Sequence, residues 1–144
     1  GTSDISAGQL IDRTGKLLGL QFPAGKAIDA LSRTSECKHK YRVKLRGLEF
    51  SFSGIQNQAE KFFADTRSPA DTARFVMNCI VGCIADTTRA ALAQNPGLTV
   101  VFSGGVASNV TLRRVCGFGV FAAPQFSTDN AMGIAVLTAL QEGL

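Results

Sequence analysis

The second half of the chain alternates between the sequence patterns of helices and of buried strands, and this alternation restricts the fold more than any other feature. The patterns predict a helix, a strand, a helix, a strand and a helix, in that order, over about residues 69–94, 98–102, 109–116, 119–123 and 129–142. The first predicted strand is nearly all apolar, which is typical of a strand buried on both faces. Such alternation indicates an α/β fold with a small sheet of parallel strands covered by helices.

The first half is predicted to be mainly helical. Ser6 and Gln9 have the spacing of a capping box, and they open a helix that ends before Gly19. Two further helices are predicted over about 25–32 and 55–65, from the spacing of their apolar residues.

Between these helices, apolar and polar residues alternate from 41 to 52. This period of two predicts one long strand or a hairpin that turns near Gly47. Four cations, at positions 40, 42, 44 and 46, would share one face of that strand. They could form a stripe that binds tRNA or the charged outer face of an exposed edge strand, and we favour the edge strand.

Composition indicates one ordinary soluble domain over residues 1–144. Hydrophobic residues make up 45% of the chain, which is enough for a core and excludes general disorder. The net charge of +4 permits an anionic partner without requiring one. The longest apolar stretch, around 75–85, is too short to span a bilayer, and no signal peptide is visible, so we expect a cytoplasmic protein without a membrane partner.

Cys79 and Cys83 are four residues apart within the predicted helix over 69–94. On a helix they would share one face. We therefore interpret them as two small buried residues and not as a redox or metal-binding pair.

Two loops follow the predicted strands of the second half, at the edge of a parallel sheet where ligands bind. The first holds Gly104, Gly105 and Asn109, with Ser108 predicted to cap the next helix. Paired glycines let a flat ligand approach the backbone, although they are also common in plain turns. The second loop holds Asp129, which could cap a helix or bind a divalent cation.

Four blocks of the sequence resemble successive blocks of the TsaD/glycoprotease family, in the same order. They are GQLIDRTGKLLGLQFPAG, EFSFSG, VFSGGVASNVTLRR and FSTDNAMGIA. This resemblance implies part of an actin/Hsp70-like (ribonuclease H-like) ATPase domain of the ASKHA superfamily. It also implies a role in making threonylcarbamoyladenosine in tRNA.

The resemblance assigns roles to individual residues. Asp12 corresponds to an aspartate that binds the nucleotide ribose, and Gly25 to a glycine of a loop that lies against the nucleotide. Asn109, after the turn of Gly104 and Gly105, corresponds to an asparagine that contacts adenosine. Asp129 corresponds to an aspartate that ligates the metal. ATP or an acyl-adenylate and a divalent metal are therefore the cofactors expected in the full-length protein, with tRNA and the family's partner proteins as partners.

The chain also departs from the family pattern. Ile5 and Gln9 stand where the family has carboxylates, Ala24 replaces a glycine, and Gln56 replaces a lysine. The N-terminal domain that carries the family's two metal-binding histidines does not match any part of this chain.

We therefore expect a C-terminal fragment of a longer two-domain protein. That protein would be either a threonylcarbamoyl transferase or a non-catalytic nucleotide-binding or scaffold paralogue. By itself the fragment is expected to be inactive, to bind nucleotide weakly or not at all, and to form homo-oligomers because Phe50, Phe52, Val100 and Phe102 would be less covered.

Overall fold

The computed structural model describes residues 1–123, and these fall into two compact units. The first unit is residues 1–98, and the second begins at Thr99. Together they give an α/β protein with one small parallel sheet, as the alternation predicts. The single domain expected over residues 1–144 stays a prediction. The predicted helix over 129–142 and the loop that holds Asp129 lie outside the described residues.

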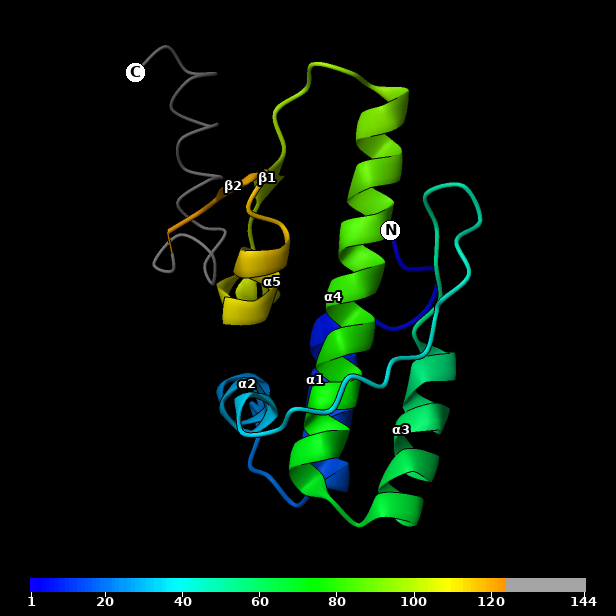
Figure 1. Ribbon diagram of the computed structural model, residues 1–144, viewed down its shortest axis with the longest axis vertical. Helices are drawn as coiled ribbons and strands as arrows, with labels where there is room; N and C mark the ends of the chain where they lie inside the picture. Colours follow the sequence, from blue (N-terminus) through cyan, green and yellow to red (C-terminus); the bar gives the residue numbers. More distant parts are fainter. Residues whose placement is uncertain (124–144) are drawn as a thin grey trace, which may run out of the picture. The chain divides into compact units, whose positions relative to one another are not determined.

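The first unit consists of four helices, with α1, α2 and α3 packed against the long helix α4 (Figure 1). Their bounds are Ala7–Leu17 for α1, Gly25–Arg33 for α2, Ser53–Thr66 for α3 and Pro69–Gln94 for α4. All four helices predicted for this region are confirmed. The predicted capping box is present too: the Ser6 hydroxyl accepts from the Gln9 N–H at 3.2 Å, and the Gln9 amide oxygen accepts from the Ser6 N–H at 2.9 Å.

The core of the first unit is made of large apolar side chains that all four helices and the segment before α3 contribute. The largest fully buried ones are Leu10, Ile28, Phe52, Ile55, Phe75, Met77, Val76 and Ile80. Phe52 is therefore not an exposed residue, and the expectation that it would lie uncovered is wrong. Cys79 and Cys83 are buried free thiols, as predicted.

By length and composition alone, α4 is apolar and long enough to cross a membrane, so the expectation that the apolar stretch around 75–85 is too short to do so is wrong. However, ten of its residues are buried, and it packs against the other three helices of its unit. Core helices of soluble proteins have the same composition, so we interpret α4 as the central core helix of the first unit.

Residues 41–52 do not form the predicted strand. The chain does turn at Gly47, which has a φ of 63°, and an isolated antiparallel bridge joins Arg46 to Glu49 across that turn. Apart from this bridge and an isolated parallel bridge between Thr2 and Phe50, the segment forms no strand pairing with any described residue. The alternation corresponds instead to burial: Val43, Leu45, Leu48 and Phe50 are partly buried, whereas Arg42, Lys44 and Arg46 are exposed.

The described part of the second unit holds a two-stranded parallel sheet, a 3₁₀ helix and a short α-helix (Figure 1). Strand β1 (Val101–Phe102) pairs with β2 (Val120–Phe121), and η1 (Gly105–Ser108) and α5 (Val110–Val115) lie between them in sequence. The parallel pairing is confirmed, but both strands are shorter than predicted. Val101 is 66% exposed and Val120 is 55% exposed, so burial on both faces is wrong for the described two-stranded sheet.

Candidate functional site

Asp12 and the turn before α2 are joined directly. One carboxylate oxygen of Asp12, Oδ1, accepts a hydrogen bond from the backbone N–H of Ala24 at 2.9 Å. Gly25, the first residue of α2, follows at once. The structure therefore brings together two of the residues singled out in the sequence, although thirteen positions separate them along the chain.

Close packing between α1 and the same turn fixes this geometry. Ala24 is 1% exposed, and it lies directly against Gly15 of α1. A Cβ atom added at Gly15 would lie 2.2 Å from the Cβ of Ala24, which is far too close for two carbon atoms that are not bonded to each other. The glycine at position 15 is thus required by the methyl group at position 24.

The start of α2 is open toward solvent. Gly25 is exposed, and a Cβ added there would meet no atom within 4 Å. No side chain caps α2, because the residue before it is Ala24. The first N–H groups of the helix thus lie beside a half-buried carboxylate, and a ligand could use both a hydrogen-bond acceptor and a set of donors here.

In the second unit, the turn after β1 depends on Gly104. Its φ of 96° and ψ of 166° are tolerated essentially only by glycine. Gly105 begins the 3₁₀ helix η1, and a Cβ added at either glycine would meet nothing within 4 Å. The backbone of this turn is consequently accessible, although the conformation of Gly104 alone is enough to explain a glycine there.

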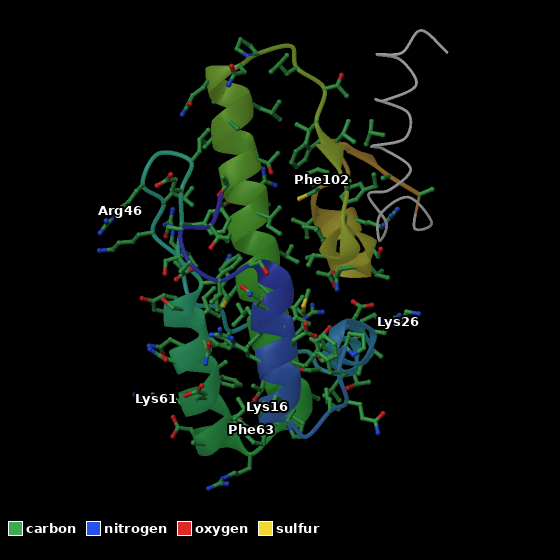
Figure 2. The ribbon with its side chains drawn as sticks, turned by 180° about the vertical axis from the view of Figure 1, so that it is seen from behind. Lys16, Lys26, Arg46, Lys61, Phe63 and Phe102 are labelled. Carbon is green, nitrogen blue, oxygen red and sulfur yellow. The ribbon has the colours of Figure 1, made fainter. Side chains whose placement is uncertain are left out.

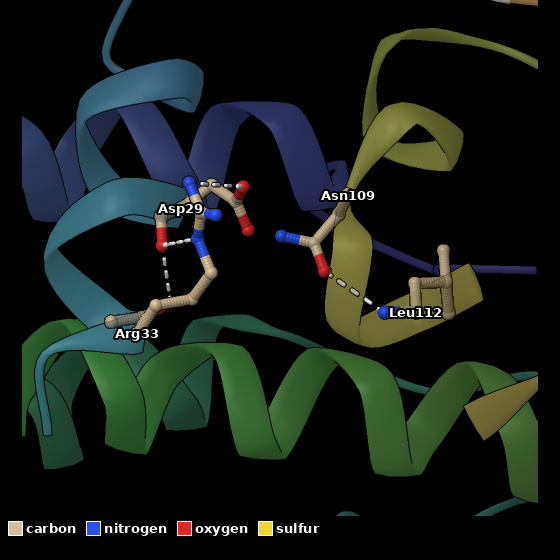
Figure 3. A network of polar contacts seen from close by, with 5 residues as sticks. Asp29, Arg33, Asn109 and Leu112 are labelled. Atoms are coloured by element: carbon tan, nitrogen blue, oxygen red, sulfur yellow. Dashed lines mark hydrogen bonds and ion pairs between the residues drawn. The ribbon is translucent and has the colours of Figure 1, made fainter. Parts of the chain in front are cut away.

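Asn109, and not Ser108, caps helix α5. The Oδ1 atom of Asn109 accepts from the backbone N–H of Leu112 at 2.9 Å, and the residue is 8% exposed (Figure 3). The prediction of Ser108 as the cap is wrong because Ser108 is the last residue of η1, and the chain leaves that helix only at Asn109. Asn109 therefore has a structural function that the sequence pattern did not indicate.

Arg113 holds the described parts of the second unit together. Its guanidinium group donates to the carbonyl oxygen of Ala107 at 3.0 Å and to that of Ala122 at 2.9 Å. It also lies over the ring of Phe121, 5.1 Å from the ring centre. These contacts fix the turn after β1 relative to the end of β2.

Asp4 has a role that no sequence motif indicated. Its carboxylate accepts from the backbone N–H of Phe52 at 2.8 Å and of Ser53 at 3.0 Å, and from the hydroxyl of Ser51. Desolvation of the carboxyl opposes ionisation, but these hydrogen bonds outweigh it and hold the pKa of Asp4 well below its usual range. Asp4 thus caps α3 although it lies 48 residues before Phe52 in the sequence. A local sequence motif cannot reveal a contact over that separation.

No metal site is evident in residues 1–123, where no three His, Cys, Asp or Glu side chains cluster. The single histidine, His39, stacks on Phe62 and Phe75 with ring centres 5.6 and 5.5 Å apart. A metal site that used Asp129 would lie outside the described residues.

Comparison with known proteins gives a consistent result. A family model described as tRNA N6-adenosine threonylcarbamoyltransferase, TsaD, matches residues 1–136. Proteins of that name are 33% identical in Chlorobium luteolum, over 97% of this chain, and 34% identical in Gluconobacter oxydans, over 94%. A relative of the same name from Streptococcus suis is 33% identical over 78% of the chain.

The chain spans 48%, 44% and 36% of the lengths of these three relatives, respectively. The family match includes residues of both compact units, with the turn beside Asp12 and the turn after β1. On this evidence, the chain belongs to the TsaD family.

Proposed function

We propose that this chain is the C-terminal, nucleotide-binding portion of a TsaD-like tRNA threonylcarbamoyladenosine transferase with an ASKHA-type fold. The observation that carries the proposal is the hydrogen bond that joins Asp12 to the turn before Gly25. It brings the proposed ribose-binding carboxylate beside an open glycine turn and an uncapped helix start.

The chemistry of this arrangement suits a nucleotide. The Ala24 N–H occupies one oxygen of Asp12, and no described residue donates to the other, which can accept a ribose hydroxyl. The backbone around Gly25 has no side chain that would keep a flat ligand away. Gly104, Gly105 and Asn109 remain proposed contacts to adenosine, by their correspondence to the family.

ATP or an acyl-adenylate and a divalent metal are the proposed cofactors of the full-length protein. The metal would stabilise negative charge on the leaving adenylate, and Asp129 is the proposed ligand from this chain. The role of residues 1–123 is to bind and orient the nucleotide.

A second candidate, a nucleotide-binding paralogue without transferase activity, is favoured by the two positions where carboxylates are missing. Gln9 is occupied with the capping box of α1, and Ile5 carries no polar group on its side chain. Neither residue can supply the charge that the family pattern has there.

Nucleotide binding by the full-length protein tests the shared part of both candidates. Asp12→Asn keeps an oxygen that can accept from Ala24 but removes the charge, so we expect ATP affinity measured by calorimetry to fall about ten-fold with little loss of stability. Asp65→Asn, the same change at an exposed position of α3, is the matched control and should bind normally. Equal affinities of the two variants and the unmodified protein would contradict the site.

Transfer to RNA separates the two candidates. The full-length protein is incubated with threonylcarbamoyl-adenylate and an unmodified tRNA transcript, and the nucleosides are then analysed by mass spectrometry. Threonylcarbamoyladenosine in the tRNA supports the transferase. Nucleotide binding without any product, together with product from a bacterial relative in the same assay, supports the paralogue.

A further inference from the structure

The positive charge of the chain is concentrated in one segment. Residues 33–46 hold six of the fifteen cations and one of the eleven acidic residues, leaving nine cations against ten acidic residues elsewhere. The overall excess of positive charge therefore comes from this segment, while the rest of the chain is close to neutral.

The cations from 38 to 46, which we call the basic segment, are exposed and form no ion pair within residues 1–123. Their side chains are Lys38, Lys40, Arg42, Lys44 and Arg46. The ion pairs within residues 1–123 join Arg33 to Asp29 and Arg89 to Asp86, and none involves the basic segment. Figure 2 shows Arg46 at the outer edge of the loop, pointing away from the helices.

The backbone of the basic segment is held in place along α4. The side-chain amide of Asn78 donates to the carbonyl oxygens of Cys37 at 3.0 Å and of His39 at 3.2 Å. The Tyr41 N–H is 3.1 Å from the sulfur of Cys79, and the His39 ring stacks on Phe62 and Phe75. These contacts order residues 37–41, and the bridge between Arg46 and Glu49 orders the far end of the segment. Less backbone conformational entropy is therefore lost when the cations bind a ligand.

A groove of about 300 Å³ lies between the basic segment and α4. Its lining includes Lys40, Tyr41, Arg42, Asn78, Gly82 and Asp86. Tyr41 is 46% exposed, and a Cβ added at Gly82 would meet nothing within 4 Å, so an aromatic ring and bare backbone face the same space. A groove of this size is at the lower end for small-ligand sites and suits a single flat group.

We propose that the basic segment binds the phosphate backbone of a folded RNA, and that the groove accepts one unstacked base beside Tyr41. The inference rests on the proposed function, because the RNA would be the tRNA substrate. Cations spaced along an ordered segment match a chain of phosphates, and an exposed ring between Lys40 and Arg42 offers stacking to a base. A membrane surface fits less well, because the large aliphatic residues of the segment, Val43 and Leu45, are partly buried and line the groove.

A matched pair of charge variants of the full-length protein tests the proposal. Lys40→Gln with Lys44→Gln removes two cations from the basic segment, and Lys16→Gln with Lys61→Gln removes two from the exposed faces of α1 and α3 (Figure 2). Binding of an unmodified tRNA transcript is measured by filter binding between about 50 and 200 mM salt, without nucleotide. Each lost phosphate contact should make the plot of log affinity against log salt concentration shallower by about 1. We expect the first variant to have this shallower slope and to bind about ten-fold more weakly, and the second variant to bind normally.

Tyr41 provides the second measurement. Tyr41→Leu removes the ring and is expected to weaken tRNA binding about ten-fold, whereas Tyr41→Phe keeps it and should bind normally. Equal losses in the two double-lysine variants, or no loss in either, would overturn the assignment of the basic segment. Equal binding by the two Tyr41 variants would overturn the role of the groove. These outcomes do not depend on nucleotide binding or transfer, so the proposed function can fail or stand separately.

Discussion

The helical unit of residues 1–98 and the described part of the second unit bury their apolar side chains to different degrees. In the first, four helices enclose large side chains such as Phe52, Phe75 and Ile80, which are at most 1% exposed. In the second, Leu112 and Cys116 are buried, but Val101 and Phe118 are 66% and 47% exposed. Within residues 1–123, large buried side chains are therefore concentrated in the helical unit, while residues 99–123 have accessible turns and few large buried side chains.

The largest expected difference in stability is between two phenylalanine substitutions, one in each unit. Phe75→Ala leaves a cavity in the helical core and should lower the free energy of unfolding by about 3–5 kcal/mol. Phe118→Ala, in the second unit, should cost about 1 kcal/mol or less because the ring is already half exposed. Urea denaturation followed by circular dichroism measures both, and losses of similar size would contradict the difference in burial between the two phenylalanines.

Replacement of the cap of α5 tests the second unit alone. Asn109→Ala should destabilise it by about 1 kcal/mol, because the Leu112 N–H loses its acceptor. Ser108→Ala is the control and should have almost no effect, since Ser108 ends the preceding 3₁₀ helix. Hydrogen exchange of residues 110–115 reports the change locally, and faster exchange in the Ser108 variant instead would assign the cap to Ser108.

Asp4 offers the corresponding test in the helical unit. Asp4→Asn weakens the cap of α3 and should cost about 1 kcal/mol, whereas Asp65→Asn at the other end of α3 should cost nothing. The folded protein keeps Asp4 ionised at lower pH than the unfolded chain does. Its contribution is therefore complete above about pH 4 and is lost as the pH falls further. Denaturation curves at about pH 7 and about pH 3 should show the Asn variant losing less stability on acidification.

The smallest expected difference between the two units is in how fast their buried thiols react with a labelling reagent. Burial raises the pKa values of Cys79 and Cys83 to about 11, so their thiols should react very slowly with iodoacetamide at about pH 8. Cys116 is also buried, but in the smaller core of the second unit. If that unit opens more readily, mass spectrometry will detect Cys116 labelling before Cys79 and Cys83. The reverse order would contradict the comparison.

The elements that could be predicted from the sequence are those with local signals. The capping box at Ser6 and the Ser68–Pro69 start of α4 depend on neighbours three residues away or fewer, and both helices form where predicted. Residues 41–52 could not be predicted in this way. Their alternation reflects apolar side chains that are partly buried and cations that are exposed, and such a pattern does not reveal whether a strand partner exists.

The candidate site was predictable only in part, for the same reason. The family resemblance identifies Asp12 and Gly25, and the structure joins them, but nothing in the local pattern around Asp12 indicates its bond to Ala24. The caps formed by Asp4 and Asn109 were missed because one spans 48 residues and the other depends on where a short 3₁₀ helix ends.

The contact between Gly15 and Ala24 has a consequence for how this family member can change. The space between α1 and the turn holds only one methyl group. With glycine at position 24, a Cβ at position 15 would lie 3.7 Å from the Cα of residue 24 and 3.8 Å from the Cβ of Leu20, which are ordinary contact distances. Gly15→Ala alone should therefore destabilise the fold, whereas Gly15→Ala together with Ala24→Gly should be tolerated. The order in which the two mutations occur thus decides whether the intermediate protein is stable. Which residues are tolerated in the turn before α2 thus depends on the residue that stands at position 15 of α1.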